Sequence, residues 1–263
     1  MTLDLKKTLP KELQSYDSLI LKTALPLIKI TITEAETLSL WNSKIGGSPY
    51  LPNAENYPNN KAGNPLIFLA QINFAETPAL SNFPTTGILQ FFIGGDDLFG
   101  LDFDAPTEQD NFRVIYYENV IEDTEKLHQD FSFVEKPLVA PIEINKEKAL
   151  SFELSQEVAS AGDYRFDTLL EGVFKYFSED DSWDLKERYA EVLPAKGHKI
   201  GGYPMFTQED PREEGHAILL LQIDTDSANG IQWGDMGVCN FFINPEDLTN
   251  KDFSKVWYNW DCY

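Results

Sequence analysis

The sequence has few of the side chains on which most enzymes and metal sites depend. It contains two cysteines, Cys239 and Cys262, and three histidines, His128, His198 and His216. Neither a Cys-x-x-Cys pair nor a His-Glu-x-x-His sequence occurs, so the usual spacings of zinc and thiol redox sites are missing. The Gly-x-Ser-x-Gly elbow of hydrolases, the Gly-rich phosphate loop and the Gly-x-Gly-x-x-Gly fingerprint are missing too. We therefore expect no cofactor, no metal and two structural thiols in a reduced, cytoplasmic setting.

Long apolar runs and positive charge are also scarce. No stretch approaches the roughly 20 apolar residues that cross a bilayer, and the first residues lack the order of a secretory signal, basic and then apolar. The 263 residues carry 21 Lys and Arg against 43 Asp and Glu, a net charge of −22 at pH 7. Such a field repels phosphate backbones and anionic membranes, so we expect neither nucleic acid nor membrane as a partner. A basic protein partner would be attracted, although solubility alone also explains the charge.

The negative charge is concentrated in one window. Residues 94–130 contain eleven Asp or Glu against only Arg113 and Lys126. A cationic partner or ligand is therefore expected here first. The spacing of the acidic residues does not match a twelve-residue calcium loop with its closing Glu, which favours a solvated face. The residues in question are Asp96, Asp97, Asp102 and Asp104, with Asp224, Asp226 and Asp235 as the analogous group later in the chain.

The sequence does contain an ordered internal repeat. Residues 44–49 (KIGGSP) return as residues 199–204 (KIGGYP), and residues 87–93 (GILQFFI) return as residues 237–243 (GVCNFFI). Several matches in the same order argue against coincidence and indicate a duplicated scaffold.

Each repeat is predicted to run from a Gly-Gly turn through a buried strand, a turn, a second strand, an acidic turn and a last strand. Continuous apolar runs at 66–70 and 217–221 suit buried strands, and residues 112–117 and 253–258 supply the last strands. An alternating strand at 27–33 precedes the first repeat. Short, turn-rich connections favour antiparallel pairing.

Helices are predicted before and between the repeats. Apolar residues recur at helical spacing over 11–24 and 163–177, and Ser182 can cap another helix that ends at 194–197. No Gly/Ser linker separates two domains, so we expect a single compact domain spanning residues 1–263. Its parts would be repeat one (about 40–117), a helical insert (about 118–198) and repeat two (about 199–263). The expected fold is α+β, with internally duplicated, mainly antiparallel sheets related by a pseudo-twofold and covered by helices.

The candidate catalytic residues are His198, Arg212, His216 and Asp235. Histidine is the usual acid or base at neutral pH because its proton leaves near pH 6.5. His198 and His216, with a nearby Asp210 or Asp235, could also form a metal site. Surface or capping roles are the alternative, and neither histidine has a counterpart in the first repeat.

The candidate binding residues belong mainly to the repeated motifs. Paired glycines permit a close backbone approach, either to a ligand in a cleft between the halves or within one repeated structural turn. A glutamine within an apolar strand needs hydrogen-bond partners, so it indicates either a polar groove or an internal network. The residues are Gly46, Gly47, Gly201, Gly202, Gln71, Gln222 and Trp233.

These motifs resemble one family. Residues 44–52 (KIGGSPYLP), 197–212 (GHKIGGYPMFTQEDPR) and 233–248 (WGDMGVCNFFINPEDL) are similar to the YwqG-like bacterial proteins. The resemblance runs from about residue 40 to the carboxyl terminus. It implies an α+β protein with an internal duplication, and it transfers no catalytic residue because the family is a domain of unknown function.

Two classes of function follow from these observations. The leading hypothesis is a non-enzymatic binding protein of the bacterial cytoplasm, one form of which neutralises a basic toxin through an acidic surface. The alternative is an enzyme or small-ligand sensor with its site between the two repeats. The sequence indicates no oligomeric state.

Overall fold

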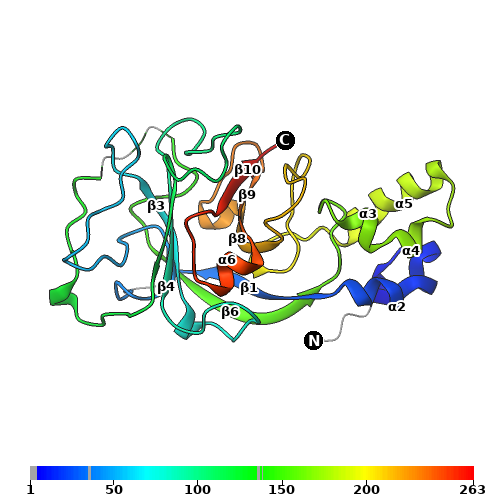
Figure 1. Cartoon of the computed structure of the whole chain (residues 1–263), viewed down its shortest axis with the longest axis horizontal. Helices are drawn as coiled ribbons and strands as arrows, with labels where there is room; N and C mark the ends of the chain where they lie inside the picture. Colours follow the sequence, from blue (N-terminus) through cyan, green and yellow to red (C-terminus); the bar gives the residue numbers. More distant parts are fainter. Residues whose placement is uncertain (1–4, 35–36, 135–136, 138) are drawn as a thin grey trace.

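The strands of the protein form one continuous sheet. The computed structural model describes residues 5–34, 37–134, 137 and 139–263, and in these residues ten strands lie in the order β10-β9-β8-β7-β1-β6-β2-β3-β4-β5. All neighbouring strands pair antiparallel. The sheet curls into a half-barrel whose two ends face each other (Figure 1). The prediction of an α+β fold with separate sheets related by a pseudo-twofold was therefore wrong.

The two repeats occupy the two ends of this sheet. Repeat one supplies β2 (Lys44–Ile45), β3 (Ile67–Asn73), β4 (Ile88–Ile93) and β5 (Arg113–Tyr117). Repeat two supplies β7 (His198–Gly201), β8 (Ile218–Asp224), β9 (Val238–Ile243) and β10 (Trp257–Asp261). The β3–β4 and β8–β9 pairs shift register at corresponding points, so the duplication extends to the strand pairing.

Two strands outside the repeats join the halves. β1 (Leu25–Thr33) and β6 (Lys148–Glu157) pair along their length, from Leu25↔Glu157 to Thr33↔Ala149. β1 also pairs with β7, and β6 pairs with β2. β6 falls within the stretch predicted as a helical insert. Its Leu-Ser-Phe-Glu-Leu sequence alternates with a period of two, which is the pattern of a strand.

Helices α2 (Asp17–Ile20), α3 (Phe166–Leu169), α4 (Glu171–Phe174) and α5 (Glu179–Val192) gather at one end of the molecule (Figure 1). They do not cover a sheet face as predicted, because their apolar side chains pack into a cluster of their own with Val158, Ala159 and Tyr203. The α-helices and 3₁₀ turns are α1 (Leu5–Thr8), η1 (Lys11–Tyr16), α2 (Asp17–Ile20), η2 (Leu21–Thr23), η3 (Phe74–Glu76), η4 (Thr124–Lys126), α3 (Phe166–Leu169), α4 (Glu171–Phe174), α5 (Glu179–Val192), η5 (Ser227–Asn229) and α6 (Pro245–Thr249).

The predicted helices differ in detail from the structure, and the one predicted over 163–177 is the two short helices α3 and α4. The helix predicted over 11–24 is a succession of 3₁₀ and α turns. α5 begins four residues earlier than predicted, because Ser178 rather than Ser182 is the cap and its Oγ accepts a hydrogen bond from Asp181 N.

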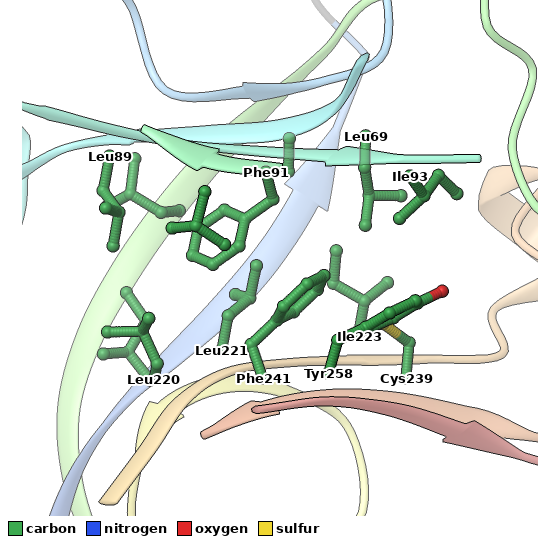
Figure 2. Close-up of a cluster of buried hydrophobic side chains, with 14 of the residues drawn as sticks. Leu69, Leu89, Phe91, Ile93, Leu220, Leu221, Ile223, Cys239, Phe241 and Tyr258 are labelled. Carbon is green, nitrogen blue, oxygen red and sulfur yellow. The ribbon is translucent and has the colours of Figure 1, made fainter. Parts of the chain in front are cut away.

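The main core lies between the two ends of the sheet (Figure 2). Leu69, Leu89, Phe91 and Ile93 point from β3 and β4 toward Leu220, Leu221, Ile223, Cys239, Phe241 and Tyr258. Phe91 and Phe241 hold the same position in the two repeats, and their ring centroids are 4.8 Å apart. Apolar side chains thus fill the space in which the two repeats face each other.

Candidate functional site

Each repeated Lys-Ile-Gly-Gly motif places a buried lysine against a glutamate of the central strand. Lys44 Nζ lies 3.1 Å from Glu147 Oε2, and Lys199 Nζ lies 2.7 Å from Glu157 Oε1. Glu147 directly precedes β6 and Glu157 ends it. The two ends of one strand therefore neutralise the lysines of both repeats.

The second glycine of each motif makes room for these carboxylates. Gly47 and Gly202 both have φ +72°, and a Cβ atom on Gly202 would overlap Glu157 Oε1. A Cβ atom on Gly47 would come within 2.6 Å of the Glu147 Cβ. Because ten residues of about 3.3 Å each separate the two glutamates, the two Gly-Gly loops lie roughly 30 Å apart and do not converge on one cleft.

The repeated glutamines form internal networks. Gln71 Oε1 accepts a hydrogen bond from Tyr50 N at 2.9 Å, and its Nε2 donates to Leu40 O and Asn42 O, both at 2.7 Å. Gln222 repeats this pattern with Met205 N, Ala195 O and Gly197 O. Both side chains are fully buried, so they hold loops to the sheet rather than line a groove.

Arg212 is enclosed in the protein. Its Nε and Nη2 donate to Asp210 at 2.9 and 2.7 Å, its Nη2 lies 3.3 Å from Asp163, and its guanidinium stacks 3.9 Å from the Phe242 ring centroid. Burial raises the pKa of Asp163, but hydrogen bonds and charge from Arg165, with a contribution from Arg212, hold that pKa below its ordinary value. These contacts tie the loop after β7 to the start of α3.

The remaining catalytic candidates lie apart from one another. The His216 Nε2 lies 3.1 Å from Lys255 O, and its ring packs edge-on against Trp257. Asp235 is exposed in the turn that follows the fully buried Trp233. Within the described residues, no group of three His, Cys, Asp or Glu side chains has an arrangement that could hold a metal ion.

His198 lines a cavity, unlike the other three candidates. Its Nδ1 accepts a hydrogen bond from Asp224 N at 3.2 Å, so its Nε2 carries the proton of the neutral ring and faces Asp226 Oδ2 at 3.4 Å. Burial lowers the pKa of His198, and Asp226 offsets part of this effect. The cavity has a volume of about 590 Å³. In repeat one, Ser43 Oγ accepts from Asn73 N at the corresponding place, so the Nδ1 contact belongs to the scaffold.

A second surface joins the two repeats. The loop after β4 packs on β10, where Trp260 Nε1 donates to Leu98 O at 2.7 Å and the Tyr258 hydroxyl donates to Phe99 O at 3.1 Å. Tyr263 N donates to Asp235 O, which brings the 234–237 turn to the same place. We call this surface the acidic face. It consists of exposed Asp96, Asp97, Asp102, Asp104 and Asp235 together with exposed Leu98, Phe103 and Met236.

The sequence indicated part of each site. The acidic window contains four of the five carboxylates of the acidic face. The sequence of this window gave no sign that the side chains of Leu98 and Phe103 are exposed, that of Phe103 at 72%. Glu147 and Glu157 were missed as partners of the buried lysines. Their position at the two ends of a period-two stretch was the available signal.

Comparison with known proteins places most of the chain in one family. The described residues contain no helix that combines the length and apolar character needed to span a bilayer. A search of the curated proteins found no match. The family model "Domain of unknown function (DUF1963)" matches residues 43–262, which leaves β1 outside the matched segment although it lies in the middle of the sheet. Since the match covers most of its length, the chain belongs to this DUF1963 family of unknown function.

Proposed function

We propose that the protein is a non-enzymatic binding protein that takes a basic protein partner on the acidic face. We also propose that it is a YwqG-like member of its family and acts in the bacterial cytoplasm, because residues 44–52 and 197–212 resemble those proteins. The observation that carries the binding proposal is the combination, on one surface, of five exposed aspartates with three exposed apolar side chains.

Charge and apolar area have complementary roles in such an interface. A net charge of −22 attracts a cationic protein over long distances and raises its association rate. Charge at an exposed rim adds little to affinity, whereas large side chains that become buried contribute most of it. Phe103, which is 72% exposed, is therefore the expected anchor. A basic toxin neutralised by this surface is one form of the partner.

A small-ligand sensor or an enzyme is the second candidate, and His198 beside a cavity favours it. The site of such a sensor or enzyme was expected between the two repeats. The cavity instead lies between β1, β7 and the end of α5.

The binding proposal is tested with a synthetic helical peptide of Lys and Leu, titrated calorimetrically into the full chain. We expect binding that weakens by about tenfold or more between 50 and 300 mM NaCl. Phe103→Ser combined with Asp97→Asn and Asp104→Asn should weaken it by at least tenfold.

The matched control is Trp183→Ser combined with Glu153→Gln and Glu187→Gln, which removes one exposed aromatic and two charges elsewhere. This control should bind the peptide as the parent does. Equal loss in both variants would show attraction to net charge alone and would refute the acidic face as a binding site.

A further inference from the structure

A cavity opens where the chain leaves α5 and enters β7. Its volume of about 590 Å³ falls within the range of small-molecule sites, about 300–1,000 Å³. Apolar residues line much of it: Leu27, Val158, Val192, Leu193 and Pro194. Such a lining suits an apolar ligand body.

The carboxylates at this cavity are already engaged by the protein. Glu157 Oε1 accepts from Lys199 Nζ and from Tyr203 N, both at 2.7 Å. Asp224 Oδ2 accepts from Gly197 N at 2.8 Å. Asp226 Oδ2 accepts from Asn229 Nδ2 at 2.6 Å and faces His198.

The lysines at the cavity divide into one that is engaged and two that are not. Lys199 is buried and paired with Glu157. Lys29 and Lys196 are exposed, and neither has an ion pair among the residues that the structure describes. Three lysines thus balance three carboxylates at this cavity, and of these charged groups Lys29 and Lys196 are the two without a hydrogen-bond or ion-pair partner among the described residues.

We propose that this cavity binds a small amphipathic organic anion. Its apolar body would lie against Leu27 and Leu193, and its carboxylate or sulfonate would lie between Lys29 and Lys196. The two ammonium groups have donors that are free for a ligand, whereas the carboxylates already accept hydrogen bonds from the protein, so an anionic head has an advantage over a neutral or cationic head on a body of the same size. The site is separate from the acidic face and does not depend on the function proposed for it.

The test uses the full chain and the fluorescent anion 8-anilinonaphthalene-1-sulfonate, displaced by ten-carbon ligands that differ only in the head group. Decanoate should displace the dye at a concentration at least tenfold lower than decanol or decylamine. Lys29→Glu with Lys196→Glu should weaken decanoate at least tenfold, whereas Lys11→Glu with Lys255→Glu, two exposed lysines elsewhere, should not.

A second variant locates the ligand. Thr31 is exposed on β1 and lines the cavity, so Thr31→Trp should fill the space while a strand tolerates the aromatic residue. We expect loss of decanoate binding with an unchanged circular dichroism spectrum. The proposal is overturned if decylamine or decanol competes as well as decanoate, or if Thr31→Trp binds decanoate as the parent does.

Discussion

Among single residues, the buried lysines show how the repeated motif works. Burial lowers the pKa of Lys199, and the charge and hydrogen bond of Glu157 oppose this shift. Lys44 and Glu147 repeat the arrangement. A sequence can show that Lys-Ile-Gly-Gly occurs twice, but the partner of each lysine lies 42 or 103 positions away, in a segment outside both repeats. No local pattern links them.

Removing one member of such a pair should be costly. Lys199→Met leaves Glu157 partly buried without its ammonium partner, and we expect the free energy of unfolding to fall by about 3 kcal/mol. Urea denaturation measures this. The double variant Lys199→Met with Glu157→Gln should recover part of the loss, and the exposed Lys255→Met should change little. A loss below about 0.5 kcal/mol in the single variant, the size of an ordinary surface effect, would contradict the role of the pair.

The Gly-Gly turn gives a second prediction. Gly202→Ala forces a Cβ into a left-handed conformation and against Glu157 Oε1, so we expect a loss of about 2–4 kcal/mol in unfolding free energy. Gly172→Ala is the matched control, because it lies in α4 with no atom near the added methyl group. It should be neutral or stabilise by up to about 1 kcal/mol. Equal effects at the two positions would disprove the close-approach argument.

The histidines predict the pH dependence of stability. Burial lowers the pKa of both His198 and His216. Between the unfolded pKa of about 6.5 and the lower folded values, the unfolded chain binds more protons, so stability falls as the pH falls through this window. Urea denaturation at pH 7.5, 6.5 and 5.5 should show this decline, with a shallower slope for His198→Gln. An unchanged slope in that variant would contradict the effect of burial on His198.

At the scale of elements, the helices and the sheet ends have separate apolar clusters. The helical cluster is built from short turns, and α5 is its one long helix among the described residues. The sheet cluster interlocks strands from both repeats (Figure 2). Segments with separate cores can open separately.

We therefore expect amide hydrogens of α3, α4 and α5 to exchange faster than those of β3, β4, β8 and β9. Hydrogen exchange followed by mass spectrometry measures this, and peptides from β1 and β6 serve as internal references. Equal exchange rates in all these segments would indicate one common opening reaction. That result would contradict the prediction that the two apolar clusters unfold separately.

The sequence predicts elements well where their pattern is local. The apolar runs and the repeated Phe-Phe-Ile segments gave β3, β4, β8 and β9 to within a few residues. β10 begins later than predicted because Phe253 is a buried loop residue before the strand. Helical spacing over 11–24 did not yield one helix, since tertiary packing of Leu13 and Ile20 is satisfied by successive short turns.

For the whole molecule, the pairing of distant strands decided the fold. A repeated set of strands can form two sheets or two ends of one, and the repeat itself does not distinguish them. The distinction depends on β1 pairing with β7, as in Leu27↔Gly201, and on β6 pairing with β2. These pairs join segments far apart in the sequence. Local sequence patterns therefore could not show that the prediction of separate sheets related by a pseudo-twofold was wrong.

The overall charge also acts on the whole molecule. A net charge of −22 destabilises a compact chain by self-repulsion, which salt screens. We expect the Tm to rise between 10 and 150 mM NaCl, as measured by scanning calorimetry. Asp97→Asn with Asp104→Asn should reduce this dependence. A Tm that is constant or falls over this range would show that self-repulsion is not a significant cost.

The central position of β1 has a consequence for synthesis on the ribosome. β1 leaves the exit tunnel before either of its neighbours, because β6 begins only at Lys148 and β7 at His198. During translation of repeat one, this strand has both backbone edges unpaired and its buried face without a cover. The nascent chain thus exposes a β-strand of nine residues until most of the protein has been made. Holdase chaperones that bind extended apolar segments should therefore recognise this chain early, at residues 25–33.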